Sequence, residues 1–521
     1  MPTLEWIGKD KVLNHHQEVP YRILDKKYTY NAESSENMII HGDNLLALKS
    51  LLPQYEGRVD CIYIDPPYNT GNEKWGYTDN VNDAKIKKWR GEVVGQEGED
   101  LSRHDKWLCM MYPRLKLLYK LLANDGYIFI SINYENESVF LRCICDEIFG
   151  RANFIGELTW ESTTQPSNAG SALFGLQQKV EPILLYIKNK KYYNGFLLKE
   201  LASNKEYPHI GKYGACRFEI IEKSDAGGYS RPSMKFSILG QYPREGKRWQ
   251  IGEETARLLE KAGKVEIVDG IVKKAVYPED EQDKKSYVPF WSHLAAVDVG
   301  TAQKGKEQLN TILNCAVGFD TVKPVELIIS LLSHFSNKAI ILDSFAGSGT
   351  TAHAVLKMNK QDGGNRKFIL VEMMDYADTI TAERVKRVID GYGEGSKAVD
   401  RLGGNFSYYE LGEPLFREDK NLNEDVGEDE IRKYVYYMET KKPLEKNADD
   451  NRYYMGKNND TAYYFYYEKD KPTMLNREFL STVKTKASGY IIYADICTLS
   501  KEILDKNGIV FKKIPRDIKS L

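Results

Sequence analysis

Asp65, Pro66, Pro67 and Tyr68 are the four consecutive residues whose types most directly suggest a reaction. They follow the apolar run 59–64, which predicts a buried strand, so they lie where that strand ends. In an open α/β sheet, ligands bind at the carboxyl ends of the strands. Proline fixes φ and has no N–H donor, so the turn is stiff and presents carbonyl acceptors beside a carboxylate and an aromatic ring.

This set of groups suits the methylation of an exocyclic amine on a nucleobase. The nitrogen lone pair of such an amine is delocalised into the ring, so the nitrogen is a poor nucleophile until acceptors hold its hydrogens. Asp65 and the Pro66 carbonyl can accept those hydrogens, and Tyr68 can stack on a base that has swung out of the helix. Taken alone, the segment is equally well explained as a stiff turn that ends a strand.

A glycine-rich segment much later in the chain predicts a binding site for a nucleotide-like cofactor. The run 339–343 predicts a second buried strand, and Gly347 and Gly349 follow it at the start of a predicted helix. Glycines let the backbone approach a ligand closely, and the helix presents its N-terminus there. A further predicted strand, 367–371, ends in Glu372, which is placed to hold ribose hydroxyls. The glycine pattern also fits the G-x-G-x-x-G/A dinucleotide fingerprint, so an NAD-dependent oxidoreductase stays open, although it leaves the first motif unexplained.

Together the two motifs resemble those of the β group of DNA adenine-N6 methyltransferases, in which the catalytic motif precedes the cofactor motif. The resemblance is closest to the modification subunits of type III restriction–modification systems. It is strong over residues 36–160 and 300–390 and patchier between them. The strings that carry it are residues 41–48, 64–72, 110–115, 343–354 and 364–372.

The resemblance implies S-adenosylmethionine as the cofactor and no metal. Asp43 is expected at the adenine end of the cofactor, Glu372 at its ribose, and the segment 319–324 over its methionine end. Where the family more often has Thr-Gln-Lys-Pro, this chain has Val322, and where the family commonly has His before Glu181, this chain has valine. The residues expected to bind the cofactor are Asp43, Asn44, Asp65, Lys323, Pro324, Asp343, Phe345, Ala346, Gly347, Ser348, Gly349, Thr350 and Glu372.

The choice of methylated atom follows from two residue types. Ring-carbon methylation needs a cysteine nucleophile, usually after proline, and none of the 7 cysteines follows a proline. Enzymes that methylate cytosine N4 usually have Ser at the position of Asp65, so adenine N6 is preferred and cytosine N4 is kept as an alternative. By resemblance, the substrate is double-stranded DNA whose target base is flipped out.

Alternating strands and helices in both halves predict a doubly wound, Rossmann-like α/β fold. Beyond the strands above, the pattern predicts strands 37–40 and 127–132 and helices 43–52, 104–122, 135–149 and 325–335. The expected domains are an N-terminal extension (1–35), a catalytic half (36–151), an inserted target-recognition domain (152–318), a cofactor-binding half (319–410), an acidic linker (411–430) and a small C-terminal α/β module (431–521). In that module we expect strands 434–437, 462–467, 489–493 and 510–513 around a helix at 499–507.

The expected recognition domain contains short strand-like runs, 154–160, 180–187 and 216–221, between turns. Cationic and aromatic residues are interleaved there, which suits phosphate contact and base reading. Any one of them is more simply a solvated surface residue, but as a region they favour DNA recognition. The candidates for DNA contact are Lys190, Lys191, Tyr213, Arg217, Arg231, Lys235, Arg244, Lys247, Arg248 and Trp249.

Composition sets outer limits on the function. A length of 521 residues predicts two or three domains, and a net charge of −2 means that any DNA groove depends on local basic patches. No run of about 18 apolar residues predicts a membrane span. The cysteines are scattered and lack metal-ligand spacing, a pattern typical of reduced cytoplasmic thiols. The first residues show no signal-peptide pattern, so we expect a cytoplasmic protein. Gly300–Lys306 has the frame of a phosphate loop, but Glu307 replaces the required Ser or Thr, so we expect only loop structure there.

Two further expectations come from the resemblance. A type III modification subunit implies a homodimer and a separate ATP-dependent restriction subunit with helicase and nuclease activity, in a bacterial or archaeal cell. The alternative in this setting is a recognition subunit whose main role is to deliver that nuclease to DNA. The residues do not specify the recognition sequence.

Overall fold

The protein is described by a computed structural model, which divides it into two compact units. The first comprises residues 1–195 and 291–521, and the second residues 196–290. Within these units the structure describes residues 3–68, 103–134, 137–166, 176–196, 199–200, 206–226, 231–281, 287–319, 321–445 and 451–515.

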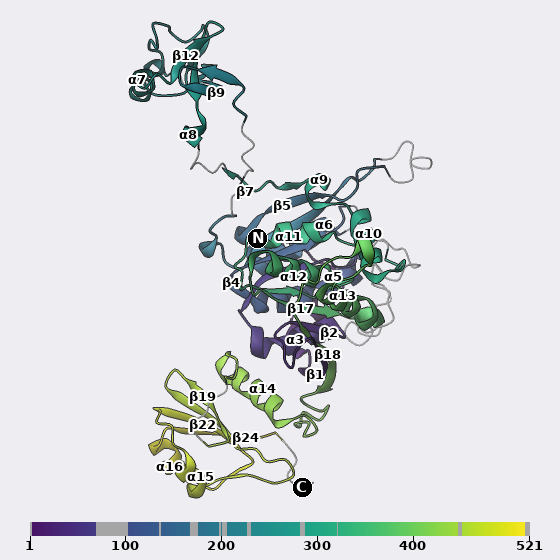
Figure 1. Cartoon of the computed structure of the whole chain (residues 1–521). Helices are drawn as coiled ribbons and strands as arrows, with labels where there is room; N and C mark the ends of the chain where they lie inside the picture. Colours follow the sequence, from purple (N-terminus) through teal and green to yellow (C-terminus); the bar gives the residue numbers. More distant parts are fainter. Residues whose placement is uncertain are drawn as a thin grey trace. The chain divides into compact units, whose positions relative to one another are not determined.

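A ten-stranded sheet forms the centre of the first unit (Figure 1), with the order β1-β18-β2-β17-β16-β3-β4-β6-β5-β15. Its middle strands run parallel, as the sequence predicts. They are β2 (Met38–His41), β17 (Lys367–Glu372), β16 (Ile340–Asp343), β3 (Val59–Ile64) and β4 (Leu122–Ser131). The flanking strands are β1 (Arg22–Tyr30), β18 (Phe406–Pro414), β6 (Val180–Ile187), β5 (Phe154–Glu161) and β15 (His293–Leu294).

The middle strands β2, β17, β16 and β3 are buried on both faces of the sheet, which explains why they are mostly apolar. Ile62 and Ile64 of β3 belong to the core shared with helices α3 (Asn44–Tyr55) and α5 (Arg103–Leu121). Cys61 and Tyr63 point the opposite way and are also buried. The other helices of this unit include α6 (Ser138–Cys145), α10 (Ala302–Leu313), α11 (Val325–Leu332), α12 (Thr350–Asp362) and α13 (Glu383–Asp390). This is the doubly wound fold that the sequence predicts.

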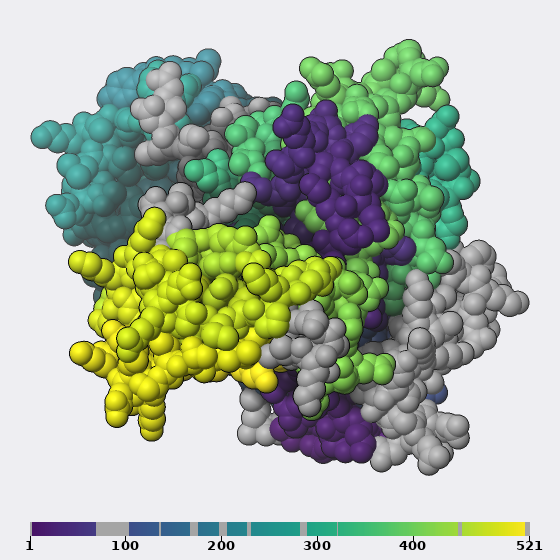
Figure 2. Space-filling view, turned by 90° about the horizontal axis from the view of Figure 1, so that it is seen from below, coloured from purple at the N-terminus to yellow at the C-terminus, as the bar shows by residue number. Residues whose placement is uncertain are grey.

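The N-terminal residues belong to the sheet and are more than a surface extension. Strand β1 pairs antiparallel with β18 at the sheet edge, and the short helices α1 (Lys9–Val12) and α2 (His15–Glu18) contact α5. In Figure 2 the purple N-terminal residues lie against light-green residues of the later chain. The boundary expected at residue 35 is therefore not a structural one.

The inserted unit is smaller than the expected recognition domain of residues 152–318. Strands β5 and β6 pair with each other, and β6 pairs with β4, so they complete the main sheet. Only residues 196–290 separate as a compact unit. It holds a four-stranded sheet of β8 (His209–Gly211), β9 (Gly214–Ile220), β12 (Val265–Val268) and β13 (Ile271–Val276), a two-stranded antiparallel sheet of β10 (Glu222–Ser224) and β11 (Lys247–Trp249), and helix α7 (Glu253–Lys261).

The C-terminal module is an α/β structure as expected, but two of its expected parts are wrong. Residues 434–437 lie in helix α14 (Glu428–Thr440), not in a strand. The expected acidic linker is ordered structure, because β18 continues to Pro414 and Leu415 and Leu422 are buried in the module's core. The sheet contains β19 (Tyr454–Asn458), β20 (Thr461–Phe465), β22 (Gly489–Ala494) and β24 (Ile509–Lys513), with helices α15 (Arg477–Thr482) and α16 (Lys501–Lys506).

Three smaller findings bear on the excluded functions. Residues 302–306 begin helix α10, capped by the Thr301 hydroxyl, where a loop was expected. In the described ranges, no helix is long and apolar enough to cross a membrane, and no group of three or more His, Cys, Asp and Glu side chains is arranged to hold a metal. The seven cysteines are free thiols.

Candidate active site

The sheet has a topological switch point between β3 and β16. These two strands are neighbours, and the chain continues from β3 to β4 on one side and from β16 to β17 on the other. Connections that leave in opposite directions open a crevice at the carboxyl ends of the two strands. Asp65 follows β3 and Ser344 follows β16, so both predicted motifs meet at this crevice.

The turn after β3 is fixed by contacts on both sides. The Trp107 indole N–H of α5 donates to the Pro67 carbonyl at 2.7 Å. The Tyr68 hydroxyl lies 2.9 Å from Asp65 Oδ1 and 3.0 Å from Glu181 Oε2, the latter on β6. Burial, followed by the Asp65 and Glu181 charges, raises the pKa of Tyr68 well above its ordinary value. Tyr68 is therefore a neutral phenol at the edge of a small anionic cluster.

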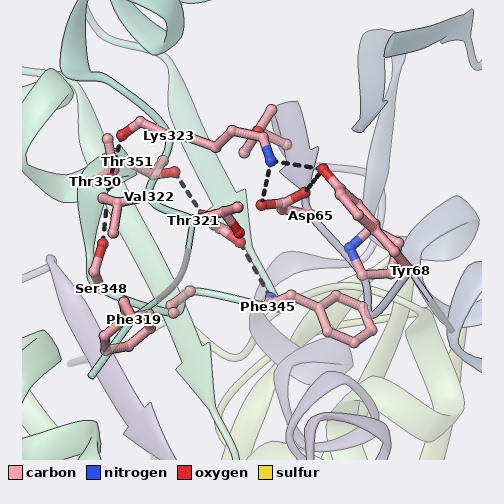
Figure 3. A pocket seen from close by; sticks show the side chains of 15 residues that line it. Asp65, Tyr68, Phe319, Thr321, Val322, Lys323, Phe345, Ser348, Thr350 and Thr351 are labelled. Carbon is pink, nitrogen blue, oxygen red and sulfur yellow. Dashed lines mark hydrogen bonds and ion pairs between the residues drawn. The ribbon is translucent and has the colours of Figure 1, made fainter. Parts of the chain in front are cut away.

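Lys323 completes this cluster (Figure 3). Its ammonium lies 2.9 Å from Asp65 Oδ2, 3.5 Å from Glu181 Oε2 and 2.6 Å from the Tyr68 hydroxyl. Burial lowers the pKa of Lys323, but the Asp65 and Glu181 charges more than offset it, and the net direction is upward. The backbone carbonyl of Lys323 accepts from the Thr350 hydroxyl at 3.2 Å. Lys323 was expected to bind the cofactor, yet its ammonium faces the catalytic turn.

The loop after β16 is shaped by left-handed glycines and by Asp343. Gly347 and Gly349 have φ values of 51° and 78°, a region that favours glycine. Asp343 accepts from the Phe345 N–H at 3.1 Å and from the Thr351 hydroxyl at 2.5 Å, which ties the loop to the first turn of α12. A pocket lies between this loop and the turn, and it is lined by Asp65, Pro66, Tyr68, Phe319, Lys323, Asp343, Phe345, Ala346, Gly347, Ser348, Thr350 and Thr351, among others.

A second pocket shares Phe345 with the first. Glu372 contributes its carboxylate there, and the Arg114 guanidinium donates to the Asn44 side-chain oxygen at 2.5 Å. The Asn44 amide in turn donates to the Ser344 carbonyl at 2.9 Å. This pocket is lined by Asn44, Pro67, Met110, Arg114, Ser344, Phe345, Val371, Glu372, Met373 and Met374.

Two buried carboxyl groups, Asp343 and Glu372, have pKa values well above the ordinary range of a carboxyl group. Burial raises the pKa of Asp343 to about 7 and that of Glu372 to about 7. Each lies at the end of a parallel strand and accepts hydrogen bonds from the loop between them. Such groups, near half-ionised at neutral pH, can accept further hydrogen bonds from a ligand's hydroxyls.

Three of the residues expected to bind the cofactor, Asp43, Pro324 and Gly349, line neither pocket. Asp43 caps helix α3, accepting from the Leu45 N–H at 2.7 Å, and forms an ion pair of 3.3 Å with Arg114. Asp43 lines neither pocket, so its contact with the cofactor stays a prediction. Pro324 precedes α11, and it too is absent from both linings.

Sequence reasoning missed several residues that the structure places at the site. Glu181, noted in the sequence only for the valine that precedes it, is a carboxylate within the apolar run of β6, and that unusual placement was the available signal. Arg384 is fully buried and donates to the Ser348 and Thr350 hydroxyls at 2.9 and 2.8 Å. Nothing in the spacing of Arg384 indicates this contact, because it lies in an ordinary amphipathic helix.

Six of the ten residues expected to contact DNA are engaged within the second unit. Trp249 is buried and its indole N–H donates to the Phe236 carbonyl, while the Tyr213 hydroxyl donates to the Ala262 carbonyl. Four cations are paired with carboxylates: Arg217 with Glu219 and Glu281, Arg244 with Glu222, and both Lys235 and Arg248 with Asp225.

The other four candidates are cations whose charges are available. In the part of the chain that the structure describes, no carboxylate forms an ion pair with Lys190, Lys191, Arg231 or Lys247. Lys190 and Lys191 are exposed just after β6 in the first unit, and the other two lie in the second.

A family model described as DNA methylase, covering the N6 and N4 methyltransferases, matches residues 59–383, which include both motifs. The chain belongs to this family. Membership in the DNA methylase family removes the oxidoreductase alternative, since the turn at Asp65 and the loop at Gly347 are parts of one matched domain.

Known relatives include both type III and type II enzymes. The StyLTI Mod subunit of Salmonella typhimurium is 28% identical, covering 79% of this chain and 66% of its own length. The EcoPI Mod subunit of Escherichia phage P1 is 31% identical, covering 71% and 63%. The type II methyltransferase M.KpnI of Klebsiella pneumoniae is 30% identical, covering 65% and 81%. The chain thus spans just under two thirds of the length of the two type III relatives.

Among solved structures, the M1.HpyAVI complex with S-adenosylmethionine covers 67% of this chain and 98% of its own, at 15% identity and a TM-score of 0.33. The PvuII cytosine-N4-specific DNA methyltransferase covers 69% and 90%, at 12% identity and a TM-score of 0.36.

Proposed function

We propose that this member of the DNA methylase family transfers a methyl group from S-adenosylmethionine to the N6 amine of adenine in double-stranded DNA. One observation carries the proposal: Asp65, Pro66 and Tyr68 of the catalytic turn and residues 345–348 of the glycine-rich loop line one pocket at the switch point of the sheet. The proposed setting is the modification and specificity subunit of a type III-like restriction–modification system in the cytoplasm of a bacterial or archaeal cell.

The residues of the two pockets fit S-adenosylmethionine. Glu372 offers a buried carboxylate for ribose hydroxyls, and the Phe345 ring is available for stacking. In the described part of the chain the buried Ser344 hydroxyl has no hydrogen-bond partner, so a polar ligand group could satisfy it. The left-handed Gly347 lets backbone approach a ligand closely. When bound, the cofactor supplies a methyl group made electrophilic by a sulfonium sulfur.

The catalytic turn has the groups that an amine acceptor needs. Asp65 and the Pro66 carbonyl accept the hydrogens of the target amine and thereby direct its lone pair. The Asp65 carboxylate also favours the positive charge that develops on the nitrogen. Tyr68 presents an aromatic ring for stacking the flipped base. Because the turn is stiff and anchored by Trp107, these groups are placed before the substrate arrives.

The preference for adenine over cytosine rests on Asp65, since cytosine-N4 enzymes usually have Ser at this position. Cytosine-N4 methylation is the second candidate for the reaction. The alternative biological role is a recognition subunit that mainly delivers a nuclease to DNA. The same site is present in that role, but DNA binding, not methyl transfer, is the main contribution of the chain.

DNA recognition is assigned to the inserted region, together with the four available cations Lys190, Lys191, Arg231 and Lys247. These charges can neutralise phosphates and so contribute sequence-independent affinity. A homodimer and a separate ATP-dependent restriction subunit complete the proposed assembly. Size-exclusion chromatography of the chain with DNA that shows only monomer would count against the dimer.

The decisive experiment uses tritiated S-adenosylmethionine and DNA from a methylation-free host. Label at adenine N6 that vanishes in Asp65→Ala supports the proposal, and label at cytosine N4 supports the second candidate. DNA binding without label supports the recognition-only role. An exposed carboxylate, Glu413→Ala, serves as the control, and single-molecule sequencing of host DNA then reads the recognition sequence.

A further inference from the structure

A single ammonium group fills the centre of the catalytic cluster. The carboxylate of Asp65, in the turn after β3, lies 2.9 Å from Lys323 Nζ. The carboxylate of Glu181, on β6, lies 3.5 Å from the same nitrogen. Lys323 is only 7% exposed, so its ammonium is shielded from solvent. The members of the cluster come from the turn after β3, from β6 and from the segment before α11. Figure 3 shows Lys323, Asp65 and Tyr68 of this cluster.

Aromatic rings complete the surroundings of this ammonium. Lys323 Nζ lies 5.1 Å from the centre of the Tyr68 ring and 5.3 Å from that of Trp160. Trp160 is held in turn, because its indole N–H donates to the Gly300 carbonyl at 2.9 Å. The two carboxylates, the Tyr68 hydroxyl and the Trp160 ring together form a site that favours a cationic nitrogen.

During methylation, the nitrogen of a target amine becomes positively charged, as the Lys323 nitrogen is. Its nitrogen is planar and neutral at first, and it becomes tetrahedral and positively charged as it bonds to the methyl carbon and the carbon–sulfur bond breaks. The nitrogen then loses one proton, which a neighbouring carboxylate accepts, and the amine is neutral again. The Lys323 ammonium is a tetrahedral, charged nitrogen already bound to Asp65, the carboxylate expected to receive the amine.

We propose that Lys323 Nζ occupies the target-amine position of the free enzyme, and that Glu181 acts with Asp65 as the second anionic group for the amine that replaces it. The inference rests on the proposed methyltransferase function and adds a residue and a displacement step to it. Entry of the base requires the Lys323 side chain to swing out. Its backbone is held by Thr350, so the displacement involves the flexible side chain alone.

The amine position can be tested with a small cation. Lys323→Ala removes three carbons and the ammonium, and propylammonium replaces those atoms. We expect propylammonium chloride to raise the melting temperature of Lys323→Ala by a few degrees over an equal concentration of sodium chloride, because a bound ligand stabilises the folded state. Wild type and Lys338→Ala, which removes an exposed lysine, should show no such difference.

The second readout asks whether that cation and the target amine share one position. In Lys323→Ala, propylammonium should raise the apparent KM for DNA several-fold and leave kcat unchanged. Stabilisation without competition against DNA would overturn the assignment, as would the absence of stabilisation. Wild-type turnover is measured first: no methyl transfer by wild type counts against the proposed function, whereas turnover without this competition counts against the inference alone.

The role of Glu181 has its own test. Glu181→Gln keeps the shape but removes the charge, and we expect kcat to fall roughly 100-fold with KM for S-adenosylmethionine unchanged. Glu157→Gln, an exposed carboxylate on the neighbouring strand β5, is the matched control. An equal loss in both variants, or a change in KM alone, would contradict the assignment.

Lys323→Met gives a further check in case Lys323→Ala does not fold. Without the ammonium, the Asp65 and Glu181 carboxylates repel each other. Adding Glu181→Gln to Lys323→Met should therefore raise the melting temperature, although Glu181→Gln alone lowers it in the wild-type background. The same change in both backgrounds would overturn the two-carboxylate site.

Discussion

The Gly347 N–H donates to the Glu372 carboxylate at 2.7 Å, which joins the glycine-rich loop after β16 to the end of the neighbouring strand β17. Glu372 also accepts from the Met374 N–H at 2.9 Å and is buried. A residue expected to hold the ribose therefore also fixes the shape of the loop. The carboxylate has a structural function that is present before any cofactor binds.

Glu372→Ala should destabilise the protein and weaken S-adenosylmethionine binding together. The substitution leaves the buried Gly347 N–H and the partly buried Met374 N–H without their acceptor, at a cost of about 2 kcal/mol in the free energy of unfolding. Urea denaturation at pH 5, where the carboxyl is largely protonated, measures this loss. Glu372→Gln retains one carbonyl oxygen and should lose less. Equal stability of Glu372→Ala and wild type would contradict the structural function.

The raised pKa values of Glu372 and Asp343 predict a pH dependence of stability. Their pKa values of about 7 in the folded protein exceed those of the unfolded chain, which lie near 4. The folded state therefore binds more protons between about pH 4 and 7, so these groups make the protein less stable as pH rises through that window, by a few kcal/mol. The decrease between pH 5 and 7 should be smaller in Glu372→Gln. An identical decrease in this variant would refute the assignment.

The affinity for the cofactor should increase with pH, whereas the stability contribution of these groups decreases with pH. Ribose hydroxyls that donate to Glu372 favour its ionised form and lower its pKa, so binding releases a proton near neutral pH. The affinity for S-adenosylmethionine should rise from pH 6 to pH 8. Calorimetric titration in buffers of different ionisation enthalpy counts the released protons, and Glu372→Gln should abolish the release.

The sequence predicted the strands of the sheet well and the C-terminal module less well. Strand 59–64 was predicted to the residue, because a strand buried on both faces is continuously apolar. The sequence predicts a strand at residues 434–437, because three tyrosines and a valine favour one. Helix α14 begins at Glu428, inside the segment taken for a linker, and the division at residue 430 separated its first turn from the rest.

The contacts among distant residues could not be predicted from either motif. The strings around Asp65 and Gly347 specify their local turns through proline and glycine. Lys323 and Glu181 meet Asp65 only because β6 and the segment before α11 reach the same end of the sheet. That arrangement depends on strand order, which no local pattern encodes, and so the ammonium of Lys323 was assigned to the cofactor.

Gly305→Ala should impair methyl transfer without touching substrate. A Cβ at this position of α10 would overlap the Val322 carbonyl oxygen and lie 3.0 Å from the Lys323 carbonyl carbon. Alanine normally favours a helix by about 1 kcal/mol over glycine, but overpacking here costs about 1–3 kcal/mol and displaces the backbone that carries Lys323. Gly156→Ala, whose Cβ meets open space, is the control. Full activity in Gly305→Ala would show that the Lys323 backbone tolerates displacement.

The division of the basic residues into paired and available groups predicts different effects on DNA binding. Lys247→Ala should weaken binding and reduce the slope of log affinity against log salt by about one, as expected for one lost phosphate contact. Arg217→Ala should leave that slope unchanged and destabilise the second unit, because Glu219 and Glu281 lose the guanidinium with which they form ion pairs. Fluorescence anisotropy over a salt series measures both. Equal slopes for wild type and Lys247→Ala would argue against its contact with phosphate.

Arg384 should tune cofactor affinity from behind the glycine-rich loop. Burial lowers its pKa to about 10, and among the described residues no carboxylate forms an ion pair with it. Its guanidinium holds the Ser348 and Thr350 hydroxyls, so it fixes the loop and places a positive charge behind it. Arg384→Met should weaken S-adenosylmethionine binding about tenfold, or roughly 1.4 kcal/mol.

Arg384→Lys separates the two contributions of this residue, since it keeps the charge and loses the paired hydrogen bonds. Recovery of most of the affinity in Arg384→Lys would assign the effect to charge, and no recovery would assign it to loop geometry. Arg387→Met is the matched control. Arg387 follows Arg384 by three residues in the same helix, is partly exposed, and forms an ion pair with Glu383 at 2.7 Å. Calorimetric titration with S-adenosylmethionine measures all three variants. Wild-type affinity in Arg384→Met would show that the buried guanidinium stabilises the fold alone.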